Sequence, residues 1–161
     1  MQALPKAYQV AIEAAIAASK AIMEIYRQDF SFLDKSDGSP VTKADLAASN
    51  IIEQLLSPLG IPITGEESEK APYEVRESWT QSWCIDPLDG TKEFIKRNDE
   101  FAVNIALINN KQAIFGLIAS PVQEEILIGG KDIGVYVFHF NDLDHIANWR
   151  PLSIPEQINV P

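Results

Sequence analysis

Cysteine is nearly absent from this sequence: Cys84 is the single one among 161 residues. One cysteine cannot form an intramolecular disulfide, a Cys-x-x-Cys redox pair or a thiolate metal site. The scarcity suits a reducing interior and favours a cytoplasmic protein. Because Cys84 lies near the end of a predicted strand, we expect it to be a small buried hydrophobic residue.

Basic residues are also few, since 13 Lys and Arg stand against 23 Asp and Glu, for a formal net charge of −10 at pH 7. Proteins hold nucleic acid largely through Lys and Arg that neutralise phosphates, so a nucleic-acid partner is not expected. Polar residues such as Lys6, Glu13 and Lys20 interrupt the apolar N-terminal segment, which therefore predicts neither a signal peptide nor a transmembrane segment. The hydrophobic content of 46% predicts a globular domain.

Apolar residues at three- and four-residue steps predict an amphipathic helix from about Pro5 to Tyr26. A second helix is expected to begin with Thr42 as its N-cap. Asp45, three residues later, would complete a capping-box-like pair. Pro58 and Gly60 are expected to end this helix.

Short apolar runs predict strands over residues 61–64, 83–85, 101–108, 113–120, 125–128 and 135–140. The third and fourth are expected to form a hairpin across the polar turn 109–112. Two helices followed by several strands predict an α+β fold, a two-layer arrangement of helices packed on a largely antiparallel sheet. We expect residues 1–140 to form a metal-binding domain and residues 141–161, with three prolines and no clear period, an irregular tail.

The densest group of polar residues lies in WCIDPLDGTKEF, residues 83–94. Asp86 and Asp89 flank a turn at Pro87 and Leu88, which frees a backbone carbonyl between two carboxylates. Mg²⁺ prefers such hard oxygen ligands and keeps several waters. The alternative is an Asp-rich turn whose carboxylates only cap backbone groups.

Gly90 and Thr91 open a predicted short helix, and free N–H groups at a helix start would face an anion near the metal. A further carboxylate source lies upstream in GEES, where Glu66 follows a predicted strand. An adjacent acidic pair is otherwise most often a solvated surface feature.

Three motifs in this order, SPVTKAD, GEES and DPLDGT, resemble those of the inositol monophosphatase superfamily of metal-dependent, lithium-sensitive phosphatases. The resemblance runs from the first helix to about Phe140 and implies the N-terminal domain of the inositol monophosphatase and fructose-1,6-bisphosphatase fold. DPLDGTKEF and EVRESW are similar to the 3′(2′),5′-bisphosphate nucleotidase branch, which acts on 3′-phosphoadenosine 5′-phosphate in sulfur metabolism. Gly65 is closer to the inositol monophosphatase pattern, so both kinds of substrate stay open.

The resemblance implies a role for each matched residue. The residues that would bind Mg²⁺ are Glu66, Asp86 and Asp89 through their side chains and Leu88 through its carbonyl oxygen. Thr91 would help Glu66 to orient and deprotonate the attacking water, and Asp45 would contact a metal-bound water or a third ion. Asp45 has an alternative interpretation as a helix-capping carboxylate. The residues that would contact the small phosphorylated substrate are Glu66, Leu88, Asp89, Gly90 and Thr91.

Full-length members of the family carry a second domain with a WDxAAG-like motif, whose aspartate completes the metal site. This sequence contains no such motif, and Trp149-Arg150-Pro151 does not match it. The first hypothesis is therefore an enzyme, or a catalytic fragment, that hydrolyses a phosphate monoester. The second is a catalytically incompetent fragment that binds metal or a protein partner, including a second copy in a homodimer.

Overall fold

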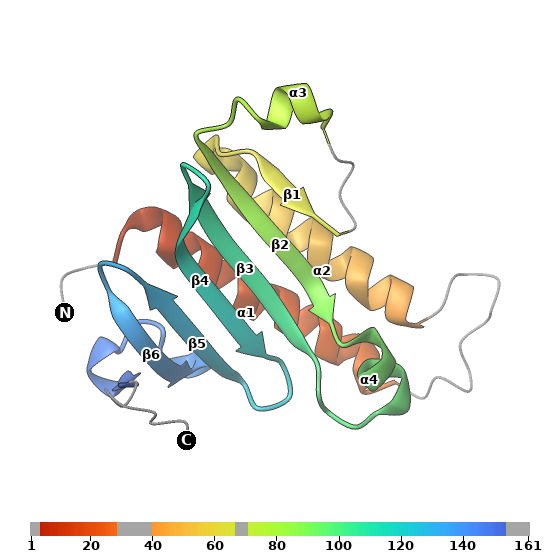
Figure 1. Cartoon of the computed structure of the whole chain (residues 1–161). Coiled ribbons are helices and arrows are strands. Elements are labelled where there is room, and N and C mark those ends of the chain that lie inside the picture. Colours follow the sequence, from red (N-terminus) through yellow and green to blue (C-terminus); the bar gives the residue numbers. More distant parts are fainter. Residues whose placement is uncertain (1–3, 29–39, 67–70, 154–161) are drawn as a thin grey trace, which may run out of the picture.

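The computed structural model describes residues 4–28, 40–66 and 71–153, and it has two layers. Helices α1 (Lys6–Tyr26) and α2 (Pro40–Leu56) pack side by side on one face of a sheet of seven strands (Figure 1). The strands follow one another across the sheet in chain order: β1 (Ile63–Gly65), β2 (Gln81–Asp89), β3 (Ala102–Asn109), β4 (Gln112–Ser120), β5 (Glu125–Gly130), β6 (Gly134–His139) and β7 (Arg150–Pro151). This confirms the predicted α+β fold.

The strand directions are mixed. β1 runs parallel to β2, whereas each later neighbouring pair in the described sheet is antiparallel. The predicted hairpin is confirmed as β3–β4, whose two turn residues Asn110 and Lys111 have φ values of 47° and 65°. Two left-handed residues give the turn a twist that matches that of the strands.

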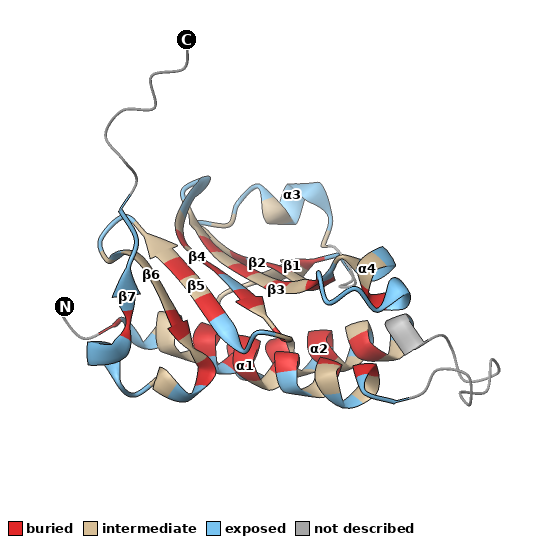
Figure 2. Cartoon of the chain, turned by 90° about the horizontal axis from the view of Figure 1, so that it is seen from below, coloured by how far each residue is buried: buried red, intermediate tan, exposed pale blue. Residues whose placement is uncertain are grey.

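Small side chains allow the two long helices to approach each other and the sheet. Ala11 and Ala18 of α1 and Ala44 and Ala48 of α2 are fully buried. Figure 2 shows the buried residues gathered between the helices and the sheet. A methyl group takes little volume, so helix axes can come close where alanines line the contact.

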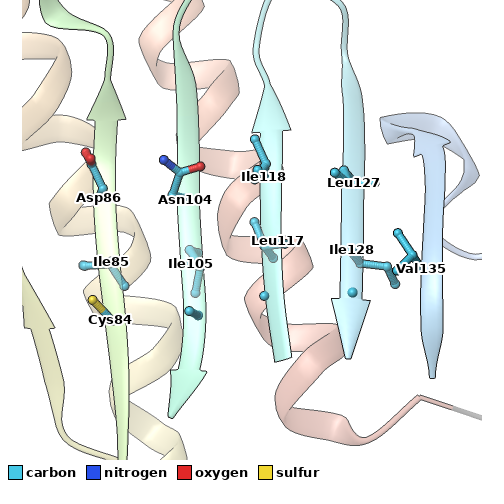
Figure 3. Close-up of a pocket in the computed structure, with 13 residues that line it drawn as sticks. Cys84, Ile85, Asp86, Asn104, Ile105, Leu117, Ile118, Leu127, Ile128 and Val135 are labelled. Carbon is cyan, nitrogen blue, oxygen red and sulfur yellow. The ribbon is translucent and has the colours of Figure 1, made fainter. Parts of the chain in front are cut away.

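The opposite face of the sheet is left open by the described residues. Alternation along β2 buries Trp83 and Ile85 against the helices, so Cys84 points the other way and is exposed. The prediction that Cys84 is buried was therefore wrong. This face contains an open hollow of ≈ 480 Å³ (Figure 3). Its bottom is formed by small residues that pair in register across four strands: Cys84, Ala106, Gly116 and Gly129.

Two further sequence expectations concern the start of α2 and the C-terminal residues. α2 begins at Pro40, so Thr42 lies in its first turn and is not the N-cap. Proline suits a first helical turn because its missing N–H would have no partner there. The second expectation concerned residues 141–161, whose described part contains short elements: η4 (Phe140–Asp142), η5 (Ile146–Asn148) and β7. Residues 154–161 lie outside the described part, so the irregular tail stays a prediction.

Trp149 explains why this part of the chain is ordered against the sheet. Its ring is 4% exposed and stacks on Phe138 of β6 with centroids 3.9 Å apart. Its Nε1 donates a hydrogen bond to the Asp142 carbonyl oxygen at 2.8 Å. A buried aromatic ring whose polar atom has a hydrogen-bond partner holds the segment in place. One isolated tryptophan creates no periodic pattern, so apolar periodicity could not predict this contact. None of the helices in the described ranges has the length and apolar character that crossing a bilayer would need.

The turn after β2 requires glycine at position 90. Gly90 has φ +92°, and a Cβ there would lie 2.8 Å from the Glu100 carbonyl oxygen. Gly60 also has a positive φ, +69°, but a Cβ there would meet nothing within 4 Å.

We expect Gly60→Ala to lower the free energy of unfolding by about 1 kcal/mol, the strain of a left-handed alanine. Gly90→Ala should cost about 2 kcal/mol more, because the new methyl group also overlaps backbone. Urea unfolding followed by tryptophan fluorescence measures both. Equal losses for the two variants would show that the backbone contact at Gly90 has no effect.

Candidate metal centre

Two carboxylates follow the same paired position on adjacent strands because β1 and β2 are parallel. Gly65 pairs with Ile85, so Glu66, just after β1, and Asp86, within β2, are the next residues along the chain. Paired strands lie about 4.8 Å apart. Ile85 is 3% exposed and faces the helices, which places Asp86 toward the open face of the sheet (Figure 3).

A β-bulge brings a third carboxylate to this end of β2. Two residues lie between Asp86 and Asp89, but only one lies between their partners on β3, Asn104 and Ala102. A bulge bends the strand and re-aims the side chains around it. Leu88, inside the bulge, is 2% exposed, so its side chain anchors the turn in the core while Asp89 is exposed.

The short helix α4 (Thr91–Lys96) follows directly and confirms the helix expected at Gly90 and Thr91. The Phe94 N–H donates to the Gly90 carbonyl oxygen at 2.9 Å, which closes the first turn. Phe94 is fully buried, with its ring centroid 5.0 Å from that of Tyr26 and 5.3 Å from that of Phe101. This aromatic cluster ties the exposed Thr91 to α1 and to the beginning of β3.

Tyr26 also carries a polar contact at the edge of the aromatic cluster. Its hydroxyl donates to Asp99 Oδ1 at 2.8 Å, and the Arg97 guanidinium lies 4.8 Å above its ring. Burial, followed by the hydrogen bond to Asp99, raises the pKa of Tyr26 above its usual value. The cluster is therefore held both by ring contacts and by a hydrogen bond across the α4–β3 loop.

Asp45 lies in the N-terminal half of α2, six residues into the helix. It follows Thr42, in the first turn, by three residues. Both interpretations of Asp45, as a helix-capping carboxylate and as a residue beside the metal, therefore stay predictions. Figure 1 shows the N-terminal end of α2 at the end of the sheet where β2 stops and α4 begins, and α2 contacts α4.

Asn104, which the sequence motifs do not include, is a further polar residue at this site. It pairs directly with Asp86 across the strands, and its Nδ2 donates to Asp89 Oδ2 at 3.0 Å. The signal that identifies it is a lone amide among apolar residues in FAVNIALI. A polar side chain in such a run needs a partner, which here is a carboxylate of the predicted metal site.

The carboxylates share one edge without forming a compact cluster. Within residues 4–28, 40–66 and 71–153, no three His, Cys, Asp or Glu side chains are grouped closely enough to hold a metal ion. Glu66 and Asp89 are exposed, so rotation about their side-chain bonds can bring their oxygens together at modest entropic cost. The Glu66, Asp86 and Asp89 metal site therefore stays a prediction.

The donor chemistry fits Mg²⁺. The available groups are carboxylate and carbonyl oxygens, which are the ligands that this ion takes in proteins. Asn104 Oδ1 is a buried acceptor without a hydrogen-bond partner, but it points toward β4 and away from the carboxylates, so it is not counted among these donors (Figure 3). A second hollow of ≈ 340 Å³ is lined by Asp89, Asp99 and Glu100 among others, and these charges repel a phosphate unless a cation intervenes.

Comparison with known proteins identifies the family of this chain. Residues 4–155 match the sequence model of the inositol monophosphatase family. The chain belongs to this family.

Similar proteins include members whose names state an activity. A 3′(2′),5′-bisphosphate nucleotidase CysQ of Shigella flexneri is 48% identical over 109 residues, which cover 65% of this chain and 44% of that protein. The CysQ of Aggregatibacter actinomycetemcomitans is 35% identical over 133 residues, covering 81% of this chain and 49% of that protein. The crystal structure of CysQ from Bacteroides thetaiotaomicron superposes with a TM-score of 0.80 at 36% identity, covering 93% of this chain and 58% of that one. The chain thus spans about half the length of these relatives.

We expect Tyr26→Phe to lower the free energy of unfolding at pH 7 by about 1 kcal/mol, because it removes the hydrogen bond to Asp99. The folded state raises the pKa of Tyr26, so its stabilising contribution is complete below pH 10 and is lost as the pH rises through the higher folded pKa. The difference between wild type and variant should therefore shrink above pH 10.

Urea unfolding at a series of pH values measures this difference. Tyr73→Phe, at a tyrosine that is 64% exposed, is the matched control and should leave the stability unchanged. If the free energies of unfolding of wild type and Tyr26→Phe differed by the same amount from pH 7 to 11, the raised pKa of Tyr26 would be contradicted.

Proposed function

We propose that this chain is the metal-binding part of a magnesium-dependent phosphomonoesterase that removes the 3′-phosphate of 3′-phosphoadenosine 5′-phosphate. The observation that carries the proposal is the parallel β1–β2 pairing, which puts Glu66 beside Asp86 at the edge where the bulge presents Asp89. The names of the relatives support the nucleotide bisphosphate over inositol phosphate as substrate. Such an enzyme would act in sulfur metabolism in the cytoplasm.

The proposed roles are those that the family resemblance implies, and the positions of the residues support them. Glu66, Asp86 and Asp89 would hold Mg²⁺ with their carboxylates, and Leu88 would hold it with its carbonyl oxygen. Bound Mg²⁺ would activate a water for in-line attack and neutralise the leaving oxygen.

The remaining residues handle the water and the substrate. Thr91, fixed through the aromatic cluster, orients the attacking water, and Glu66 takes up its proton with the help of the Thr91 hydroxyl. Asp45, from the neighbouring end of α2, would contact a metal-bound water or a third ion. The phosphate lies against the turn formed by Leu88, Asp89 and Gly90.

A second function is favoured by the open face of the sheet. Ile118 at its centre is 50% exposed, and apolar residues line most of the large hollow (Figure 3). Such a surface suits a partner protein or a second copy of the chain. Cation binding without turnover, accompanied by self-association, would support this function over catalysis by the chain alone.

We expect Asp89→Asn to remove most cation binding and any phosphatase activity, because the site loses a charged ligand. Isothermal titration with Mg²⁺ and a phosphate-release assay measure the two effects, and Li⁺ should inhibit release. Asp132→Asn, on the exposed turn between β5 and β6, is the matched control and should behave as wild type. Undiminished turnover in excess chelator would rule the mechanism out.

We expect the 161-residue chain by itself to bind one Mg²⁺ well and to turn over roughly a thousandfold more slowly than a complete metal site allows. A second ion would lack the aspartate that the WDxAAG-like motif supplies in the family, so the leaving oxygen would lack an electrostatic partner. Calorimetry gives the number of sites, and phosphate release from 3′-phosphoadenosine 5′-phosphate and from inositol 1-phosphate gives the rates. Two tight sites with ordinary turnover would contradict this account.

A further inference from the structure

Asn104 occupies an unusual place on the open face of the sheet. Its neighbours on the same face of β3, Ala102 and Ala106, are apolar, and its partner on β4 is the exposed Ile118. On β2 it faces Asp86. The amide therefore stands at the boundary between the apolar hollow and the carboxylate edge (Figure 3).

The amide group is oriented by one hydrogen bond. Nδ2 donates to Asp89 Oδ2 at 3.0 Å, and in Figure 3 the nitrogen points toward β2 while the oxygen points toward β4. The reverse orientation would set the amide oxygen against a carboxylate oxygen, and two acceptors repel each other. The contact with Asp89 therefore decides which way the side chain points.

This orientation leaves a buried acceptor unsatisfied. Asn104 Oδ1 is buried and has no hydrogen-bond partner. Burying an acceptor without a partner costs free energy, whereas an apolar side chain of the same shape would avoid that cost. Residues at functional sites often lower the stability of the fold in this way, and Asn104 lies beside a carboxylate of the proposed site.

We propose that Asn104 is a positioning residue for the cation site and acts through Asp89. Asp89 is exposed on a bulge, and the Nδ2 hydrogen bond restricts its rotation, so one carboxylate oxygen is held while the other is left for the cation. Partners of metal ligands that restrict them in this way strengthen metal binding. The inference rests on the proposed function, because it requires Asp89 to be a ligand.

The test compares Asn104→Leu, of nearly the same shape, with wild type in two measurements. Mn²⁺ titration by electron paramagnetic resonance should give an affinity weakened by about 10- to 100-fold, the usual effect of losing such a partner. The melting temperature in chelator should stay the same or rise, because the unsatisfied acceptor is gone. Asn109→Leu, at the other end of β3, is the matched control and should leave the affinity unchanged.

Three variants keep the outcomes distinct. Asn104→Ala, which also lacks the donor, should weaken binding as much as Asn104→Leu, even if leucine packs poorly. In an Asp89→Asn background, Asn104→Leu should cause no further loss, because the two residues act as one unit. Two results would overturn this inference alone. One is wild-type Mn²⁺ affinity in both Asn104 variants, and the other is a loss of Mn²⁺ affinity on Asn104→Leu that is as large in the Asp89→Asn background as in wild type. A wild-type chain that binds no Mn²⁺, or binds it equally after Asp89→Asn, would overturn the proposed function together with the inference.

Discussion

The parallel pairing of β1 with β2 is the constraint on which the site depends. Strand β1 has three residues, yet its direction decides where Glu66 emerges. If β1 ran antiparallel against the same residues of β2, Glu66 would follow beside Ser82, roughly 13 Å from Asp86 at 3.3 Å per residue. The parallel arrangement instead lets residues separated by twenty positions in the chain meet at one edge of the sheet.

Rigid support under the exposed carboxylates is the second feature of the proposed site. The carboxylates of Glu66 and Asp89 are exposed, while the residues beneath them are buried: Leu88 in the bulge and Phe94 in α4. The buried anchors fix the backbone, and the exposed side chains keep the freedom to close on a cation. Asn104 limits that freedom for Asp89 by its hydrogen bond.

The sequence predicted those elements whose apolar pattern extends over many residues, such as α1 and the β3–β4 hairpin. The sequence predicted less well where the local structure depends on a single residue or contact. Thr42 was expected as the N-cap of a helix that begins at Pro40, and Cys84 was expected to be buried although alternation with Trp83 turns it outward. The motifs indicated Asp86 and Asp89 as candidates, but the proposed role of Asn104 depends on the register between β2 and β3, which the sequence pattern does not give.

The most direct test of the central claim is a crystal structure of this chain grown with Mn²⁺, which shares with Mg²⁺ a preference for oxygen ligands and gives an anomalous signal. The account predicts an anomalous peak about 2.1 Å from carboxylate oxygens of Glu66, Asp86 and Asp89. A peak that involves none of these residues, or no peak at saturating Mn²⁺, would contradict it.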